Sequence, residues 1–418
     1  MTTERLDLVV FGASSFVGRL LCRYLLQAFG CRGELRWALA GRSQARLGEV
    51  RDELGLHAQE LPILQADAAD AAALRGLCAA ARVVVSTVGP YALHGEPLVQ
   101  ACAETGTDYC DLTGEVPWIR RMLQRHEALA QASGARIVHC CGFDSLPSDL
   151  GVHHLQGLAM RRFGVPCTRV KMRVSRLRGG VSGGTVASLL NVLKEAAADP
   201  ALRRELADPY SLWPADAPRG VRQPQVLGPE FDPDFDAWIA PFVMAAVNTR
   251  VVQRSNLLSG MAYGADFAYD EATLTGPGLK GRAAAAALSA GLGGFVLAGA
   301  LPPTRALLER LVLPRPGQGP SPEAQQQGSF ELLFHGSTAG GRAVRTRVTG
   351  DRDPGYGSTA KMLGQAAACL ALDVPKGEPG GGFWTPATIF GDRLVERLTA
   401  YAGLGFEPLP DMGLNPTR

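Results

Sequence analysis

The feature that most constrains the fold is a short apolar run that stops at a glycine and is followed by a helical pattern. Residues 6–11 are apolar except for Asp7 and favour a β-strand, and Gly12 ends the run. Apolar residues then recur at the spacing of one helix face, at Val17, Leu20, Leu21, Tyr24 and Leu25. Residues 35–40 form a second strand-like run, which ends at Gly41. The segment 6–43 therefore predicts a strand–loop–helix–strand unit.

Strand-like and helical patterns alternate as far as residue 141. We expect further strands over residues 61–66, 82–88, 109–112 and 136–141, and helices from residue 43, over 98–105 and over 118–133. Strands that alternate with helices in this way build a parallel sheet with helices on its faces. We therefore expect a Rossmann-type, doubly wound α/β domain over residues 1–145.

The rest of the chain has a different pattern, which predicts a second, α+β domain over residues 146–352. Its expected elements are a helix over 147–160, an alternating strand over 168–177, a glycine-rich turn over 179–184, a helix from Thr185, and strands over 328–337 and 342–351. Residues 199–236 predict a surface excursion, and residues 314–327 predict a linker. Helices over 358–372 and 386–402 are expected to pack residues 353–418 back on the Rossmann domain.

The charge balance and the cysteines restrict the class of protein. The chain has 42 Lys and Arg residues against 40 Asp and Glu residues, so we expect no broad positive surface and no nucleic-acid partner. None of the nine cysteines belongs to a CxxC pair, and several lie in apolar runs, such as Cys140 and Cys141. No signal-peptide pattern precedes the first strand. These features favour a reducing, cytoplasmic location.

One apolar segment bears on location as well. Residues 283–301 carry no charge and are followed by Pro302 and Pro303. About 18 apolar residues suffice for a membrane-spanning helix, but this segment is mostly Ala and Gly and is therefore weakly hydrophobic. We expect either a buried or half-buried helix of the second domain, or a helix or hairpin on a membrane or acyl-lipid surface; a true span is disfavoured. The surface alternative places the protein at the inner face of the plasma membrane.

The loop after the first strand follows a strand and opens a helix, which is the context that the glycine-rich fingerprint of dinucleotide-binding folds requires. Gly12 permits the tight turn, Gly18 permits close packing of the helix on the sheet, and the helix N-terminus attracts a pyrophosphate. Ser15 stands where the fingerprint usually has its middle glycine. A plain strand-to-helix turn is the alternative. We predict cofactor contacts from Gly12, Ala13, Ser14, Ser15, Phe16, Val17 and Gly18.

The end of the second strand decides between the two nicotinamide dinucleotides. An NAD site requires a carboxylate there for the ribose hydroxyls, and the sequence has Arg42 and Ser43 instead. A guanidinium and a hydroxyl suit the 2′-phosphate of NADP(H), and Arg46 adds charge one turn later. Arg42 as an ordinary surface residue is the alternative. Asp67, after the third strand, is a weaker candidate for contact with the adenine edge.

The fourth strand ends at the edge where a nicotinamide ring is expected. This stretch reads Thr87, Val88, Gly89 and Pro90. In a doubly wound sheet the carboxyl ends of the strands border the cofactor, and Gly89 and Pro90 allow the backbone to come close to it. We predict that these four residues contact the cofactor; a purely structural strand stop is the alternative.

Several longer strings resemble the saccharopine dehydrogenase-like oxidoreductases. Within that group they are most similar to the bacterial trans-acting enoyl reductases of lipid and polyketide synthesis. The most specific strings are VGPY (88–91), HGEP (94–97) and DLTGE (111–115). Further strings cover residues 141–149, 182–185, 353–356, 359–362 and 382–386. The resemblance extends over nearly the whole chain and thins between residues 199 and 327.

The resemblance implies an NADPH-dependent reductase. The apolar second domain favours the C=C bond of an acyl or polyketide enoyl thioester as substrate. An acyl carrier or synthase is then an expected partner, and a homodimer is one assembly to test. Two alternatives stay open. One is a saccharopine-type reductase of the C=N bond of an amino-acid-derived imine, and the other is a non-catalytic NADP-binding protein at lipid surfaces.

Reduction of an enoyl thioester needs a hydrogen-bond donor at the enolate oxygen and a proton for the α-carbon. Tyr91 and His94 follow the fourth strand, Asp144 lies at the expected domain boundary, and Lys361 lies in a C-terminal helix. We expect these four side chains to be the catalytic candidates. Each also has a structural alternative: stacking for Tyr91, helix capping for His94, a turn for Asp144 and a solvated helix position for Lys361.

The remaining polar residues of these strings are secondary candidates. Ser145 and Tyr356 lie close to the main candidates, while Asp111 and Glu115 are expected to bind local backbone N–H groups. The adjacent histidines at 153–154 are not spaced for a metal on one helix face, and no HExxH string is present, so we expect no metal site. No G-x-S-x-G elbow follows a strand, which argues against a serine hydrolase.

Overall fold

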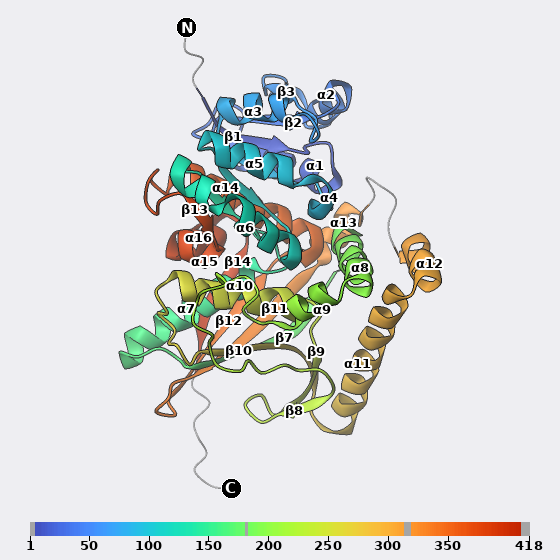
Figure 1. Ribbon diagram of the computed structural model, residues 1–418, viewed down its shortest axis with the longest axis vertical. Coiled ribbons are helices and arrows are strands. Elements are labelled where there is room, and N and C mark those ends of the chain that lie inside the picture. Colours follow the sequence, from blue (N-terminus) through green and yellow to red (C-terminus); the bar gives the residue numbers. More distant parts are fainter. Residues whose placement is uncertain (1–4, 180–182, 313–318, 411–418) are drawn as a thin grey trace.

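Two seven-stranded sheets organise the chain, one toward the top and one toward the bottom of Figure 1. The computed structural model describes residues 5–179, 183–312 and 319–410. The first sheet has the order β13-β6-β5-β4-β1-β2-β3, and every neighbouring pair is parallel. The expected Rossmann-type doubly wound sheet is thereby confirmed. Its strands are β1 (Leu6–Phe11), β2 (Trp37–Gly41), β3 (Ile63–Gln65), β4 (Ala81–Ser86), β5 (Asp108–Asp111), β6 (Arg136–Val138) and β13 (Gly382–Trp384).

The central strands of this sheet are buried on both faces. Val83 and Val85 of β4 lie in one apolar core, and Val84 lies in a second core. Because successive side chains of a strand point to opposite faces, an unbroken apolar run suits a sheet covered on both sides. The covering helices are α1 (Phe16–Phe29), α2 (Gln44–Glu53), α3 (Ala71–Ala80), α5 (Glu96–Thr105), α6 (Val116–Ser133) and α14 (Thr359–Leu372).

The second sheet is mixed, with the order β14-β12-β11-β7-β10-β9-β8. Strands β7 and β10 pair in parallel, and the other neighbouring pairs are antiparallel. Helices α7 (Leu146–Phe163) and α10 (Ala245–Leu258) pack between this sheet and the first. One apolar core continues from β1 through α7 to β7 and β11. The strands are β7 (Arg169–Arg178), β8 (Glu230–Asp232), β9 (Ala237–Pro241), β10 (Ala268–Gly276), β11 (Ser329–Ser337), β12 (Ala343–Gly350) and β14 (Leu404–Leu409).

Residues near the C-terminus serve both sheets. Strand β13 pairs with β6 of the first sheet, whereas β14 pairs with β12 of the second. Helix α14 packs so closely on α1 that a Cβ placed on Gly364 would lie 2.8 Å from the Tyr24 ring. The C-terminal segment therefore joins the two halves of the molecule. A π-helical turn (Pro354–Ser358) leads into α14.

Several expected elements differ from the structure. The expected closing helix over 386–402 is two helices, α15 (Pro386–Ile389) and α16 (Asp392–Tyr401), because Gly391 between them has a φ of 52°. The segment 199–236 is not wholly a surface excursion, since it contains α9 (Pro200–Ala207) and several buried apolar residues, among them Tyr210, Leu212 and Trp213.

The expected linker also contains structure. Its residues 322–327 form the short helix α13 (Pro322–Gln327). Residues 313–318, and residues 180–182 of the expected glycine-rich turn, lie outside the described residues. The helix expected from Thr185 is α8 (Gly183–Ala198).

The apolar segment forms the long helix α11 (Gly278–Ala300), which runs along one side of the molecule and is followed by α12 (Pro302–Val312) (Figure 1). Of its 23 residues, Gly281, Ala285 and Gly299 are buried. Within the part of the chain that the structure describes, it is the one helix long and apolar enough to cross a membrane. Most of α11 faces outward, so it is not a fully buried helix, but one narrow face packs on β9, β10 and α8, as a half-buried helix of the second domain would.

Candidate functional site

The glycine-rich loop between β1 and α1 packs tightly against the carboxyl end of β4. Gly12 has a φ of 86°, a conformation that favours glycine, and a Cβ placed on it would lie 2.6 Å from Val88 Cγ2 and 2.8 Å from Thr87 Oγ1. A Cβ placed on Gly18 would lie 2.2 Å from the Gly12 carbonyl oxygen. Ala13 between them is fully buried. Both glycines are therefore required for the close approach of loop, helix and strand.

Ser15, which replaces the usual middle glycine, fastens this loop to β4. It is the N-cap of α1, where its Oγ accepts a hydrogen bond from Gly18 N at 2.9 Å. The same Oγ lies 3.0 Å from Thr87 Oγ1, and Thr87 Oγ1 is also 3.0 Å from the Gly12 carbonyl oxygen. The hydroxyl thus holds the loop in the shape that a dinucleotide fingerprint requires, although the glycine is missing.

The N-terminus of α1 retains free donors. Among the described residues, none accepts a hydrogen bond from the backbone N–H of Phe16 or Val17. Such N–H groups, together with the helix dipole, favour a phosphate. The Phe16 ring meets the Tyr356 ring edge-on at 4.9 Å, and Gly183 N donates to Tyr356 Oη at 2.8 Å. Segments distant in sequence thus converge beside the predicted phosphate position.

The end of β2 presents a cation, Arg42, at the expected position of the 2′-phosphate. Arg42 is exposed, and its guanidinium forms no hydrogen bond or ion pair with any described residue. Ser43 is the N-cap of α2 and accepts from Arg46 N at 3.4 Å. Asp67 is exposed, but one of its oxygens accepts from Ala69 N at 2.9 Å and so stabilises a local turn. This edge therefore offers an unpaired guanidinium and no free carboxylate at the position of a ribose contact.

The buried carboxylate of Glu115 fixes the loop after β4 through hydrogen bonds to its backbone. Glu115 accepts hydrogen bonds from Tyr91 N and Ala92 N, both at 2.9 Å, as expected for a local backbone partner. The Gly89–Pro90 peptide bond is cis, and Gly89 is exposed. The backbone of this loop is thus fixed, with Gly89 on the outside.

Tyr91 does not have the position of a free proton donor. Its side chain is buried against Trp118, with the ring centres 5.3 Å apart, and its hydroxyl donates to the Ser86 carbonyl oxygen at 2.9 Å. Burial raises the pKa of this phenol well above its usual range. In this geometry the Tyr91 side chain packs in the core and its hydroxyl is engaged by the backbone; its catalytic role stays a prediction.

His94 and Lys361 occupy different surroundings. The imidazole of His94 is exposed at the end of the short helix α4 (Tyr91–His94) and makes no hydrogen bond to a described residue. Lys361 Nζ lies 3.0 and 3.1 Å from the two carboxylate oxygens of Asp351. Lys361, at the start of α14, thus forms an ion pair with Asp351, and its catalytic role stays a prediction. A role for His94 stays a prediction.

Asp144 is the candidate whose surroundings change its chemistry most. It is half-buried, and Thr185 Oγ1 of α8 donates to its Oδ2 at 3.3 Å. Gly114, just after β5, faces it: a Cβ placed there would lie 3.6 Å from Asp144 Oδ2. Burial raises the pKa of Asp144 to about 6, and the Thr185 hydrogen bond opposes that rise. A carboxyl with this pKa can hold and release a proton near neutral pH.

Helix α8 brings these parts together over the strand ends. Ser188 Oγ donates to Glu115 Oε1 at 2.8 Å, one turn after Thr185 meets Asp144. We call the resulting arrangement the strand-end site. It comprises the N-terminus of α1, the Ser15–Thr87 link, the Gly183–Tyr356 contact and the Thr185–Asp144 pair. Sequence reasoning did not list Thr185 and Ser188 as site residues, since the only signal near them was the SGGT string (182–185) at the start of α8.

Ser145 is not part of this arrangement. It is fully buried, and its hydroxyl donates to Asn248 Oδ1 of α10 at 2.8 Å. Asn248 in turn donates to Ser148 Oγ and Glu271 Oε2. These bonds join α7, α10 and β10, so Ser145 has a structural role.

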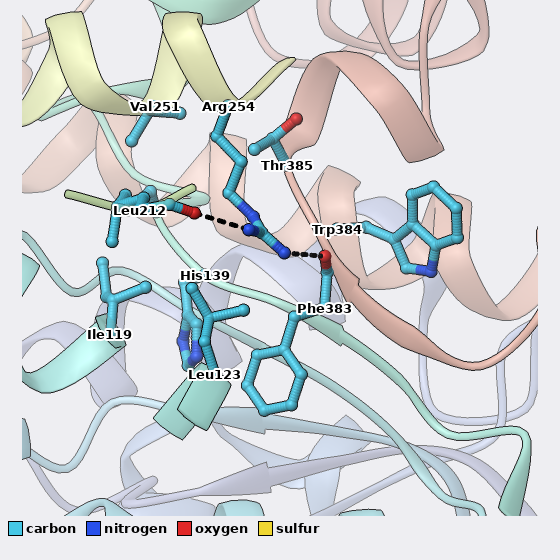
Figure 2. Close-up of a pocket in the computed structure, with 10 residues that line it drawn as sticks. Ile119, Leu123, His139, Leu212, Val251, Arg254, Phe383, Trp384 and Thr385 are labelled. Carbon is cyan, nitrogen blue, oxygen red and sulfur yellow. Dashed lines mark hydrogen bonds between the residues drawn. The ribbon is translucent and has the colours of Figure 1, made fainter. Parts of the chain in front are cut away.

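A buried histidine was also missed. His139 Nδ1 lies 2.7 Å from Asp111 Oδ2, which also accepts from the Tyr109 hydroxyl at 3.0 Å. The other oxygen of Asp111 binds backbone N–H groups, as expected from the sequence. His139 Nε2 has no partner among the described residues and borders a cavity of about 20 Å³, enough for about one water molecule. Figure 2 shows this apolar cavity with Arg254 at one side, where the guanidinium donates to the Leu212 and Phe383 carbonyl oxygens.

The comparison with known proteins identifies close relatives over the full length. The family model described as the saccharopine dehydrogenase NADP binding domain matches residues 8–138. A Mycobacterium tuberculosis protein provisionally named a trans-acting enoyl reductase is 42% identical over 420 aligned positions, which cover 97% of this chain and 98% of that protein. A trans-acting enoyl reductase of the same organism is 38% identical over 404 positions, covering 94% and 95%. The resemblance inferred from the sequence strings is confirmed.

Solved structures confirm the fold. The chain superposes on apo saccharopine dehydrogenase (L-Glu forming) from Saccharomyces cerevisiae with a TM-score of 0.54 and 14% identity, covering 96% of this chain and 99% of that one. Homospermidine synthase from Legionella pneumophila in complex with NAD gives a TM-score of 0.51 at 11% identity, covering 100% and 94%. At such low identity these likenesses concern the architecture alone.

Proposed function

Because the chain belongs to the family of trans-acting enoyl reductases, we propose that it reduces the C=C bond of an enoyl thioester with NADPH. The observation that carries the proposal is the identity of 38% to 42% over nearly the whole chain, with the strand-end site in place. The family and the NADP-binding domain make the protein an NADP-dependent oxidoreductase. The substrate is the part that we propose.

The residues of the strand-end site fit NADP(H). The loop at Gly12 has no room for a Cβ, and neither the amides of Phe16 and Val17 nor the guanidinium of Arg42 has a hydrogen-bond partner among the described residues. We expect the α1 N-terminus to hold the pyrophosphate and Arg42 to hold the 2′-phosphate. When bound, NADPH supplies the hydride for the β-carbon of the substrate.

Asp144 is the residue that we propose to supply the proton. Addition of hydride to the β-carbon leaves an enolate, and the α-carbon then gains one proton to give the saturated thioester. The pKa of Asp144 is raised to about 6, so its carboxyl group carries a proton at pH values below that. The Thr185 hydroxyl donates to this group and orients it. Re-protonation from solvent completes the cycle, so that one NADPH and one proton are consumed for each C=C bond.

For the substrate, we propose an acyl or polyketide chain of lipid synthesis, presented by an acyl carrier or a synthase. The names of the relatives describe reductases that act in trans, which supports a partner that carries the chain to this protein. We also propose a cytoplasmic location at the inner face of the plasma membrane. The described cysteines are all free, and eight of the nine are buried, which supports a reducing compartment.

The test is NADPH oxidation by the purified protein with a panel of enoyl thioesters and a panel of amino-acid imines. The proposal expects turnover of enoyl thioesters only. Turnover of imines alone would favour the C=N alternative, and NADPH binding without turnover of either panel would favour a non-catalytic binding protein. Asp144→Asn should lower turnover without a change in the Kd for NADPH.

A further inference from the structure

Helix α11 exposes an apolar surface that the described part of the fold leaves uncovered. Its buried residues Gly281, Ala285 and Gly299 are separated by about one and four helical turns, so they share one narrow face. The other faces are apolar and open to solvent. The exposed large side chains here and at the start of α12 are Leu279, Leu288, Val296, Leu297, Leu301 and Leu307. So large an exposed apolar surface marks a docking site.

Positive charge lies at both ends of this surface. Lys280 and Arg282 begin it and are exposed, and no charged residue occurs from there until Arg305 in α12. Over residues 278–312 the sequence has four cations, which include Arg310, against one carboxylate. Exposed apolar residues between clusters of Lys and Arg are typical of segments that bind anionic lipid.

We propose that α11 and α12 dock on a lipid surface with anionic headgroups. The leucines enter the acyl region, and the cations at the two ends contact the headgroups. Each cation close to such a surface strengthens binding by about fivefold.

The connections of α11 make it an interfacial helix rather than a membrane span. Its first residue, Gly278, is separated from β10 by Pro277 alone, and α11 packs on β9, where Arg282 near its start lies over the Trp238 ring. At the other end Gly299 lies against α8, where an added Cβ would be 2.7 Å from Leu193 Cδ1 and 3.2 Å from Leu190 Cδ2. Both ends are thus attached to the same folded body, whereas a spanning helix has its ends on opposite sides of the bilayer.

The charges also favour lipid over a second copy of the chain. In a two-fold symmetric pair, antiparallel α11 helices would bring Lys280 and Arg282 of one copy beside Arg305 and Arg310 of the other. Like charges would then face each other across an apolar contact, which is unfavourable. An anionic bilayer meets the same groups with opposite charge.

The location of α11 links the lipid surface to the strand-end site. Helix α8 contacts α11 through Leu190 and Leu193, and its first turns hold Asp144 through Thr185 and Glu115 through Ser188. Acyl chains at the lipid surface would therefore lie one helix away from the strand-end site. This last step rests on the proposed function, whereas the docking itself does not.

Vesicle flotation of the full-length protein tests the docking. The protein should float with vesicles of phosphatidylcholine and phosphatidylglycerol, and more weakly with phosphatidylcholine alone. Leu279→Gln combined with Leu297→Gln should lower the partition coefficient at least about tenfold, because these two leucines, 82% and 64% exposed, lie 18 residues apart on the face opposite the packed one and both lose their burial in lipid. Lys280→Gln should weaken binding to the anionic vesicles only. The matched control is Leu56→Gln, since Leu56 is 88% exposed on another part of the surface and should leave flotation unchanged.

Three results would overturn the proposal: no flotation on either vesicle, flotation that the paired leucine variant leaves unchanged, or an equal loss with Leu56→Gln. A dimer in sedimentation velocity that dissociates in Leu297→Gln, without flotation, would assign the surface to a second copy instead. NADPH binding and the unfolding temperature are measured on every variant. They should stay unchanged, since these leucines are exposed and lie outside the strand-end site. Failure of the docking is thereby distinguished from failure of the reductase.

Discussion

Arg42→Ala should convert the protein from one that prefers NADPH to one that does not distinguish the two cofactors. Hydrogen bonds to a charged group contribute about 1.5–3 kcal/mol. Arg42 is exposed, so solvent weakens its interactions and the lower end of that range applies. A loss of about 1.4 kcal/mol raises the Kd about tenfold. Because the guanidinium has no partner among the described residues, its removal breaks no hydrogen bond or ion pair with that part of the chain.

The assay is a fluorescence titration of wild type and variant with NADPH and with NADH. The Kd for NADPH should rise about tenfold, and the Kd for NADH should change by less than about twofold, since NADH lacks the 2′-phosphate. Arg23→Ala is the control, because Arg23 is an exposed cation on α1. An unchanged preference in Arg42→Ala, or an equal loss for both cofactors, would refute the assignment of the 2′-phosphate site.

Three further predictions concern the loop, the proton donor and the core. Gly12→Ala should cost about 1–2 kcal/mol of stability, because φ is 86° and the added Cβ would lie 2.6 Å from Val88; thermal unfolding and NADPH titration should both show the loss. Asp144 has a pKa raised to about 6 in the folded state, so the native state binds its proton more tightly than the unfolded state does. The free energy of unfolding should therefore fall as the pH rises from about 4 to about 7. In Asp144→Asn this slope should be reduced and stability at about pH 8 should be higher by up to about 3 kcal/mol, as measured by urea unfolding. Asp108→Ala should destabilise the protein by about 3–5 kcal/mol in the same assay, because it leaves the buried Arg136, which now lies 2.6 Å from that carboxylate, without its main partner.

The first sheet could be predicted because its signals are local. The valines of β4 form an unbroken apolar run, and Gly12 and Gly18 stand at fixed positions around the end of β1. The expected ends of β3, β4 and β6 were too late in the sequence. The residues that follow these strands have strand-like composition, but they do not pair with a neighbouring strand and instead form the loops at the edge of the sheet. Composition alone does not show where pairing stops.

Helix α10 was not predicted, because it carries no local signal in the sequence. It is buried among other elements yet contains polar residues such as Asn248, Gln253 and Arg254, so no apolar stripe of helical period marks it. Those side chains are satisfied by partners far away in sequence, as when Arg254 donates to the Phe383 carbonyl oxygen. Strands β13 and β14 are similar cases, because their partners β6 and β12 come from other parts of the chain.

The candidate site was predictable in position but not in detail. Parallel strands place the residues that follow them along one edge, which made Thr87 a candidate, and Asp144 was a candidate because it lies at the expected domain boundary. Which hydroxyl or carboxyl faces that edge depends on tertiary contacts. The Tyr91 hydroxyl donates to the Ser86 carbonyl oxygen inside the fold, and Lys361 forms an ion pair with Asp351. His139 lies just beyond β6 within an apolar string and gave no signal in the sequence.

The transfer of deuterium from NADPH to product tests the central claim most directly. The protein is incubated with NADPH deuterated at the transferred position of the nicotinamide ring and with an enoyl thioester, and the product is analysed by mass spectrometry and NMR. The claim predicts one deuterium in each saturated thioester, at the β-carbon, with the α-carbon proton taken from water. A product without deuterium, or deuterium found instead at the amine carbon of an amino acid formed from an imine, would contradict it.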